Sequence, residues 1–297
     1  GSYGAHRIPM AELTEAQKVQ VARGFILSSP PGEIGDVIKD VQVLLGGEAS
    51  LQSHLPGIVR EYNLKNHEVC KGSNGERVMI CPAGEADSSS SSFVDAEGGN
   101  VLTVDHVKGQ VVGAGGDAPA VSEAVEELRG GAQRELTRYV KAALAEGAAA
   151  VHGKAEADGS VVLHCTVVGK KLNPANFWNG RWTASYACTI APGATSAKIE
   201  GLVRADVHVY EEGNVQFESR KQVSATVSFA SPGDFGAALA KKVKEVEDGY
   251  HRFLDEQYGS AAEASFKLLR RKMPRTQQKF QWGQVASYSL ARELTHK

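Results

Sequence analysis

Residues 202–210 are Leu-Val-Arg-Ala-Asp-Val-His-Val-Tyr, and after the first position apolar side chains alternate with polar ones. Successive side chains of a β-strand point to opposite faces of the sheet. The segment therefore predicts a strand with one apolar face and one face that is wet or covered by an amphipathic element. The apolar set is Val203, Ala205, Val207 and Val209, and the alternating set is Arg204, Asp206, His208 and Tyr210.

Similar patterns flank this strand on both sides. Residues 161–168, 181–190 and 215–229 are rich in β-branched and aromatic residues, with turn-forming residues between the segments, which predicts an antiparallel meander. Further strands are expected at 78–81 and 101–104. We expect residues 64–230 to form an antiparallel β-sheet region with one inserted helix near 122–144, kinked or broken at Gly130-Gly131.

The N-terminal region has helical periodicity instead. Thr14 and Gln17 can form a capping box, and a proline-rich turn at 29–33 precedes a second apolar stripe. A third helix is expected at 50–62. Residues 11–63 thus predict an antiparallel three-helix stalk, whereas residues 1–10 are interpreted as a cloning remnant that ends at a natural start, Met10.

A very long helix is predicted at 231–273. Ser231 can cap it, Pro232 suits its first turn, and Leu239 and Val243 begin an apolar stripe, with a break expected near Gly259-Ser260. About 40 residues of helix span roughly 60 Å. Such a helix needs a sheet wider than this chain supplies, which favours a partner subunit that continues the sheet.

Bulk composition excludes several classes of protein. The chain has 297 residues, of which 42% are hydrophobic and 23% charged, so a sizeable core is expected. A net charge of −2 provides no global attraction to nucleic acid. The four cysteines have no repeated spacing, and we find no leader and no long apolar run, which favours the reducing cytoplasm.

The sequence lacks the motifs of common catalytic and cofactor sites. We find no metalloprotease, nucleophile-elbow, phosphate-loop or calcium-loop pattern. The serine tract 88–92 and the glycine-rich stretch 113–116 are interpreted as loops, the latter in preference to a phosphate site. His67, Cys70 and Cys81 lack the paired spacing of a zinc site. We therefore predict a protein that is not an enzyme, with no catalytic residues, no metal and no cofactor.

The C-terminal segment concentrates positive charge. Residues 267–297 carry a local charge of +7 on a chain of net −2. After Pro274, apolar side chains recur at helical spacing, so 274–297 can form an amphipathic helix. A terminal helix docked on its own domain is the alternative, but a basic hinge beside an apolar stripe favours binding to an acidic surface of another protein.

Two segments resemble one known family. Residues 173–182, Asn-Pro-Ala-Asn-Phe-Trp-Asn-Gly-Arg-Trp, resemble the tryptophan block of F-actin capping protein alpha subunits, and residues 266–288 resemble the C-terminal stretch of that family. The Pro-Pro-Gly-Glu at 30–33 and the segment 210–216 fit it too. The resemblance covers the chain from Ala11 to its end.

The resemblance implies a fold and a function. It implies an α+β fold, with the stalk, an antiparallel sheet shared with a partner subunit, a long helix across that sheet and a C-terminal amphipathic tentacle. It also implies calcium-independent binding to filament barbed ends, which blocks subunit addition and loss. The partners implied are a capping protein beta subunit in an obligate heterodimer, favoured over a homodimer, phosphatidylinositol bisphosphate as inhibitor, and protein regulators of the family's kind, in the cytoplasm and actin cytoskeleton.

By resemblance, Lys267, Arg271 and Lys279 match basic residues that meet actin, and Trp282 begins the tentacle. Lys267 and Arg271 are also the expected phosphoinositide contacts. Gln277 departs from the family, which usually has arginine there. The full set of expected actin-binding residues is Lys267, Arg270, Arg271, Lys272, Arg275, Lys279, Trp282, Val285, Leu290 and Leu294.

Two rival functions use the same basic segment. A membrane-surface protein would insert the basic amphipathic tail in a bilayer and bind phosphoinositides without actin. A nucleic-acid binder is disfavoured, because the cluster has few interleaved aromatic residues and the net charge is negative.

Overall fold

The computed structural model describes the main chain of residues 13–45, 49–73, 75–87, 89–211 and 214–272; side chains of 49–50 and 260–272 lie outside the description. The chain divides into two units, 1–245 and 246–297, and each is described by itself. The helices are α1 (Glu15–Leu27), α2 (Ile34–Leu44), α3 (Ala49–Gln52), α4 (Leu55–Asn66), α5 (Glu123–Ala143) and α6 (Pro232–Lys272). The strands are β1 (Val69–Lys71), β2 (Arg77–Met79), β3 (Glu85–Asp87), β4 (Ser92–Val94), β5 (Asn100–Asp105), β6 (Gln110–Asp117), β7 (Ala148–Ala155), β8 (Val161–Asn173), β9 (Trp178–Ile190), β10 (Ser196–Val209) and β11 (Val215–Ser228). Two short 3₁₀ helices are η1 (Pro82–Gly84) and η2 (Pro174–Asn176).

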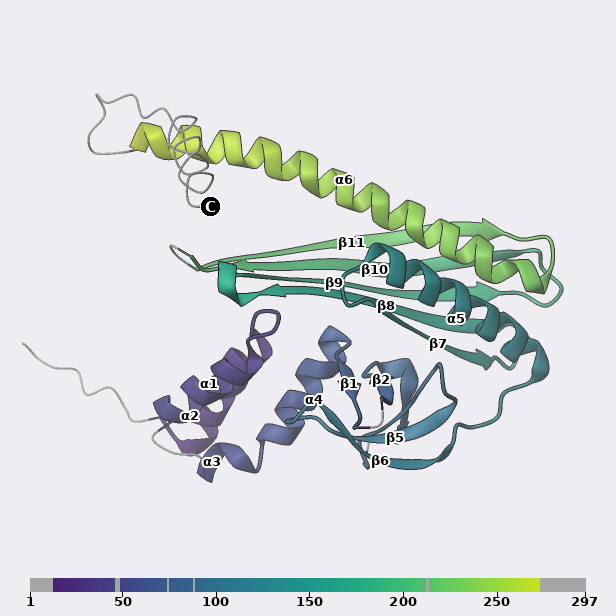
Figure 1. Cartoon of the computed structure of the whole chain (residues 1–297), viewed down its shortest axis with the longest axis horizontal. Coiled ribbons are helices and arrows are strands. Elements are labelled where there is room, and N and C mark those ends of the chain that lie inside the picture. The colour runs from purple at the N-terminus through teal and green to yellow at the C-terminus, as the bar shows by residue number, and fades with distance from the viewer. Residues whose placement is uncertain (1–12, 46–48, 74, 88, 212–213, 273–297) are drawn as a thin grey trace, which may run out of the picture. The chain divides into compact units, whose positions relative to one another are not determined.

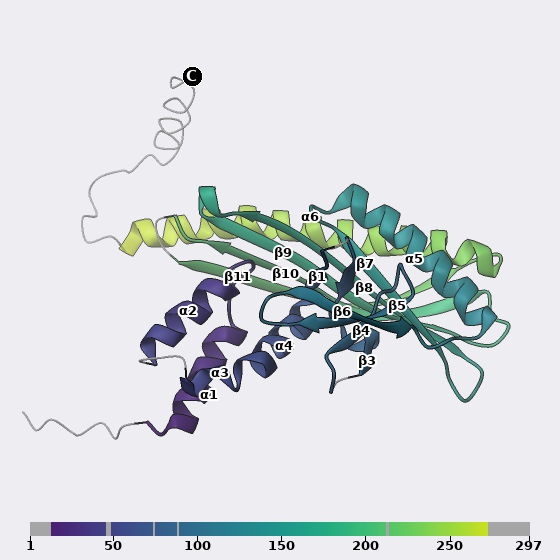
Figure 2. The same ribbon diagram turned by 60° about the horizontal axis from the view of Figure 1, so that its bottom comes forward.

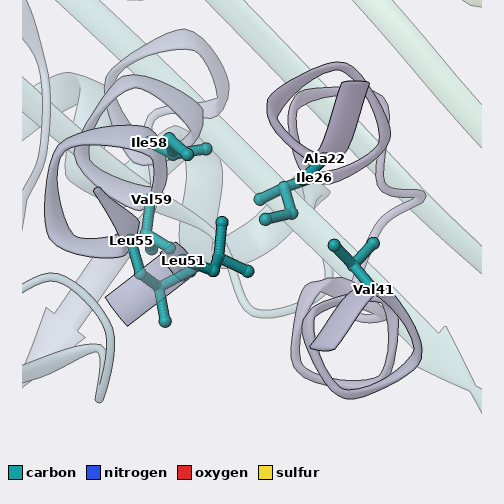
Figure 3. Close-up of a cluster of buried hydrophobic side chains, with 7 residues drawn as sticks. All are labelled: Ala22, Ile26, Val41, Leu51, Leu55, Ile58 and Val59. Carbon is teal, nitrogen blue, oxygen red and sulfur yellow. The ribbon is translucent and has the colours of Figure 1, made fainter. Parts of the chain in front are cut away.

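Helices α1–α4 form an N-terminal helical bundle with its own apolar core. The predicted capping box at the start of α1 is confirmed: the Thr14 amide donates to Gln17 Oε1 over 2.9 Å, and the Gln17 amide donates to Thr14 Oγ1 over 3.3 Å. Figure 3 shows the side chains that meet between the helices. These are Ala22, Ile26, Val41, Leu51, Leu55, Ile58 and Val59.

The bundle has four helical segments where three were predicted. The expected third helix at 50–62 is divided into α3 and α4. Pro56 explains the division, because it has no N–H to donate to the carbonyl of Gln52 and suits the first turn of a new helix.

The five-stranded sheet confirms the predicted meander. Its order is β11-β10-β9-β8-β7, and every neighbouring pair is antiparallel. Figure 1 shows the long strands β8–β11 side by side. The prediction missed β7, whose alanine-rich sequence gives little β signal; α5 and β8 pack against it.

The sequence left open whether the polar face of residues 202–210 is exposed to solvent or covered by another element. In the structure it is covered. Arg204, Asp206 and His208 are all less than 10% exposed. Figures 1 and 2 show α4 and the six-stranded sheet on the side of the five-stranded sheet away from α5. The polar face of β10 is therefore an internal surface.

A second, six-stranded sheet occupies residues where mainly loops were predicted. Its order is β2-β1-β6-β5-β4-β3. The glycine-rich stretch 113–116 belongs to β6, so its prediction as a loop is wrong. In the serine tract, residues 89–91 form a turn as predicted, but Ser92 begins β4 and is buried. The reason is pairing: β6 is held by its ladder with β5, above a core that contains Phe93 and Leu102, although its own residues have low strand propensity. The β1–β6 pair is parallel, so the 64–230 region is not purely antiparallel.

Helix α5 runs without interruption through Gly130-Gly131, so the predicted kink is wrong. The reason is a close approach to the start of α6. A Cβ built on Gly236 would lie 2.4 Å from the carbonyl oxygen of Gly131. The missing side chain of Gly236 lets the two helix backbones touch, whereas a Cβ on Gly131 would meet nothing within 4 Å.

Helix α6 begins as predicted. Ser231 Oγ donates to Asp234 Oδ2 over 2.7 Å, and Leu239 and Val243 are buried. The helix continues through Gly259-Ser260 to Lys272, so the expected break is absent from its described main chain. Within the second unit, Leu254 is buried and Phe253 is half-exposed. No described helix is both long and apolar enough to cross a membrane.

We predict that Gly236→Ala lowers the free energy of unfolding by about 1–3 kcal/mol, because the new methyl group overlaps the Gly131 backbone. Gly249→Ala is the matched control in the same helix, since nothing lies within 4 Å of a Cβ there. That control should raise stability by roughly 0.5–1 kcal/mol. Urea denaturation measures both, and equal responses would contradict the packing role of Gly236.

Candidate functional site

The basic segment predicted as the binding site begins on the last turns of α6. Lys267, Arg270, Arg271 and Lys272 are all within this helix. Lys267 and Arg271 are four residues apart, about one helical turn. The main chain therefore brings these two residues to the same side of α6. The other predicted residues, Arg275, Lys279, Trp282, Val285, Leu290 and Leu294, lie outside the described residues, as do Gln277 and the predicted amphipathic helix.

The second candidate surface is the outer edge of β11. This strand has 14 residues and ends the five-stranded sheet, and no other strand pairs with its outer side in the part of the chain that the structure describes. Most of its residues are exposed, including Val215 at 62%. A long unpaired edge presents a row of N–H and C=O groups that can pair with a strand of another chain.

A buried ionic cluster, here called the Arg181 junction, joins the helical bundle to the five-stranded sheet. Arg181 on β9 donates to Asp206 Oδ2 on β10 from Nε over 3.1 Å and from Nη2 over 2.9 Å. Its Nη1 donates to the hydroxyl of Tyr62 on α4 over 3.2 Å and to Glu68 Oε1 over 3.5 Å. Glu68 also pairs with Lys170. Burial alone would lower the pKa of Arg181, but Tyr62, Asp206 and Glu68 together raise it above its ordinary value.

Glu33 makes a second link between bundle and sheet. Its Oε1 accepts from Asn179 Nδ2 over 2.9 Å and lies 2.6 Å from His208 Nδ1. Glu33 is the residue before α2, so one carboxylate bonds both β9 and β10 from the start of that helix.

The Asn-Phe-Trp-Asn-Gly-Arg-Trp block, residues 176–182, is thus a structural element. Asn179 and Arg181 point into the junctions just described, and Trp178 lies under Lys171, whose Nζ is 5.6 Å from the ring centroid. Phe177 adopts a left-handed conformation with φ 58° and packs edge-to-face on Tyr210. The block holds the turn before β9 and anchors the bundle to the sheet. No pattern in the sequence predicted this structural role.

The described residues offer little for catalysis or metal binding. No group of three or more His, Cys, Asp and Glu gathers there as a metal site would require. His67, which was weighed as a ligand, instead has Nε2 at 2.8 Å from Ser185 Oγ. Cys70 is buried in the core of the six-stranded sheet and Cys81 in a neighbouring apolar cluster, and burial raises the pKa of both thiols.

We predict that Arg181→Met lowers the free energy of unfolding by about 3–5 kcal/mol, because it leaves the buried Asp206 and the partly buried Glu68 without their common cation. Arg220→Met is the control: Arg220 is exposed and pairs with exposed Glu218, so the loss should stay within about 0.5 kcal/mol. Urea denaturation of the two variants measures the loss of unfolding free energy in each. Similar losses would show that the Arg181 junction is not what holds the bundle to the sheet.

His67 gives the same interface a pH dependence. The residue ends α4 in a left-handed conformation, and burial, helped by Arg204 and Arg181, lowers its pKa from 6.5 to about 4. The folded state therefore keeps His67 neutral while the unfolded state takes up a proton between pH 6.5 and 4. Stability is fully present above that window and is lost as the pH falls through it.

We expect His67 alone to contribute a loss of about 3 kcal/mol of unfolding free energy between pH 6.5 and 4. His67→Asn keeps a side chain that tolerates the left-handed conformation. The variant should take up one proton fewer on unfolding, so its unfolding free energy should depend less steeply on pH between 6.5 and 4. His152, whose pKa burial also lowers to about 4, would account for part of the remaining slope. Exposed His54→Gln is the control; a profile unchanged in His67→Asn would contradict this origin.

Known proteins are similar to this chain over nearly its whole length. The family described as F-actin capping protein alpha subunit matches residues 22–293. The F-actin-capping protein subunit alpha of Dictyostelium discoideum is 30% identical over 278 residues, which cover 93% of this chain and 97% of that protein. The corresponding subunit of Chaetomium thermophilum is 31% identical over 287 residues, covering 95% and 97%.

A solved structure shares the fold. The homodimeric actin capping protein alpha subunit from Plasmodium berghei superimposes with a TM-score of 0.70 at 17% identity, covering 81% of this chain and 92% of that one. At this identity the likeness concerns the fold alone: α+β, with β-sheets and a long C-terminal helix.

Proposed function

Because the chain belongs to the F-actin capping protein alpha-subunit family, we propose that it is the alpha subunit of a heterodimer that binds actin filament barbed ends and blocks subunit addition and loss. The family is one of structural actin-binding proteins of the cytoskeleton and not of enzymes. The observation that carries the proposal is the family match over residues 22–293, which includes both the tryptophan block and most of the basic C-terminal segment.

The free edge of β11 supports a partner subunit. A second sheet added along its 14 residues would remove the exposed edge and bury a large interface, as obligate dimers do. We assign the partner as a capping protein beta subunit, in an obligate complex. The P. berghei protein is described as a homodimer, so a second copy of this chain is the competing partner.

We assign filament binding to the C-terminal segment. Lys267 and Arg271 on α6, with Arg270, Lys272, Arg275 and Lys279, would approach an acidic surface of terminal actin subunits. Summed positive charge speeds such an encounter. Trp282, Val285, Leu290 and Leu294 would then bury the apolar face of an amphipathic helix in a groove and slow release.

Regulation follows from the same charges. Lys and Arg side chains need no metal to attract an acidic surface, which makes the proposed capping calcium-independent. Polyphosphorylated lipid headgroups attract cations by about 1 kcal/mol each near the membrane. Phosphatidylinositol bisphosphate bound at Lys267 and Arg271 would therefore compete with actin. The proposed location is the cytoplasm, on the actin cytoskeleton.

The deciding experiment is elongation of pyrene-labelled actin from filament seeds, with the chain co-expressed with a beta subunit and the mass of the complex measured. We expect sub-stoichiometric block of elongation in the presence or absence of calcium. Lys267→Glu with Arg271→Glu should slow association about tenfold. Deletion of residues 282–297 should instead speed dissociation at least about tenfold, because the apolar anchors are lost.

Lys241→Glu with Lys244→Glu, two exposed positions in the same helix, is the matched charge control and should leave capping unchanged. Unchanged rates for the Lys267 and Arg271 variant in single-filament measurements would contradict the assigned roles. Binding to anionic vesicles without any block of elongation would favour the lipid-surface function instead.

A further inference from the structure

Strand β11 carries an acidic and a basic residue at equal distances from a neutral one. Glu218 and Arg220 flank Ser219, and their side chains lie on the same face of the strand. Both are about half exposed, 48% for Glu218 and 56% for Arg220, and they pair with each other. Lys221 is the other charged residue of the strand. A copy of β11 that runs in the opposite direction would present a base opposite this acid and an acid opposite this base.

Backbone geometry limits how two β11 strands can pair along their free edges. The ladder with β10 turns the N–H and C=O groups of every second residue toward β10, and the residues between direct these groups outward. Residues that face each other across the new edge must therefore both have odd numbers or both have even numbers. The two-fold axis of an antiparallel β11–β11 pair then passes through one residue, which faces its own copy.

The register centred on Ser219 sets opposite charges against each other. In it, Glu218 faces Arg220 of the second copy, and Arg220 faces Glu218 of the second copy. Opposite charges directly across a strand pair stabilise it, and like charges destabilise it. A register centred on Arg220 or on Lys221 would set that cation against its own copy. Registers centred on residues 222–224 would face each charged side chain with a neutral one or with none.

The same register also covers apolar side chains at the start of the strand. Val215 is 62% exposed in the single chain and would face Val223 of the second copy. Phe217 would face Lys221, whose aliphatic stem can cover the ring while its ammonium group stays in water. Registers centred on residues 222–224 would instead leave Val215 beyond the overlap. Charge and apolar burial thus favour the same centre.

We propose that β11 pairs with β11 of a second copy of this chain, antiparallel and centred on Ser219, whenever no beta subunit occupies the edge. The overlap covers residues 215–223 of each strand and joins two five-stranded sheets into one. A second copy is the occupant because Glu218 and Arg220 complement their own copies in this register. The homodimer and the proposed heterodimer use the same edge, so they exclude each other. The proposal does not depend on the capping function.

Cysteine cross-linking of the full chain, expressed without a beta subunit, reads the register directly. Facing Cα atoms of an antiparallel pair are about 4.5–5.5 Å apart, within the range of roughly 4.4–6.8 Å that a disulfide spans. Diamide serves as the oxidant and takes up the two electrons and two protons that the thiols release. We expect Ser219→Cys to give a disulfide-linked dimer. The four native cysteines are buried, so they should not contribute.

Gln222→Cys is the matched control on the same strand. It lies away from the proposed two-fold axis and faces Gln216 of the second copy, so it should stay unlinked. Gln222→Cys would link efficiently only in a register centred on itself. Cross-linking of this control in place of Ser219→Cys would overturn the proposed register.

Sedimentation equilibrium of the same chain measures the dimer dissociation constant. Glu218→Arg sets arginine against arginine twice in each dimer, and should weaken association about tenfold or more. Arg220→Glu should do the same with glutamates. Combining the two substitutions exchanges the charges and restores opposite signs across the edge, so affinity should return to within about threefold of the wild type.

Rescue by the exchanged pair separates direct pairing across the edge from a general loss of folding. A double variant that associates no more tightly than the single variants would overturn the proposal. A chain that stays monomeric, or that aggregates without a species of two copies, would also overturn it. None of these outcomes bears on capping, which is measured in the complex with a beta subunit.

Discussion

The fold depends on one guanidinium group. Arg181 bonds a neighbouring strand through Asp206, helix α4 through the Tyr62 hydroxyl, and the segment after that helix through Glu68. A buried cation is tolerable only when its donors are satisfied and its charge is neutralised, so each of these groups fixes the position of the others. Apolar packing could hold a bundle against a sheet in several registers. The Arg181 junction permits only one of these registers.

The two surfaces that we propose bind other proteins lie in different parts of the chain. The β11 edge belongs to the first unit, whereas Lys267 and Arg271 belong to the second. Strand pairing along an edge is long, directional and largely independent of salt, which suits a permanent partner. Clustered cations attract quickly and at a distance but are screened by salt, which suits an encounter with a large charged assembly. In the proposed function, binding of the partner subunit and binding of the filament would therefore use separate parts of the chain.

Period-two and helical patterns predicted the long elements, because each one buries a face of its own. The strands β8–β11 and helices α1, α2 and α6 were found in this way. The six-stranded sheet was largely missed, since β6 is stabilised by pairing with β5 and not by the propensities of residues 113–116. The Gly130-Gly131 pair was misjudged as a helix break for a related reason: the α5 backbone at Gly131 packs against Gly236, more than 100 residues away. In the candidate site, charge counting found the basic segment, but Arg181 and Glu33 carried no local signal, because their partners come from distant elements.

The order of elements along the chain has a consequence for biosynthesis. The five-stranded sheet is a meander in which every strand pairs with its sequence neighbour, so its closure needs only local chain. The contacts that join the bundle to it are remote: Tyr62 and Arg181 are 119 positions apart, and Glu33 and His208 are 175 apart. Helices α1–α4 therefore leave the ribosome well before their docking surface has been translated. Through that interval the emerging chain carries an amphipathic bundle without its counterpart, a period in which chaperone protection is most useful.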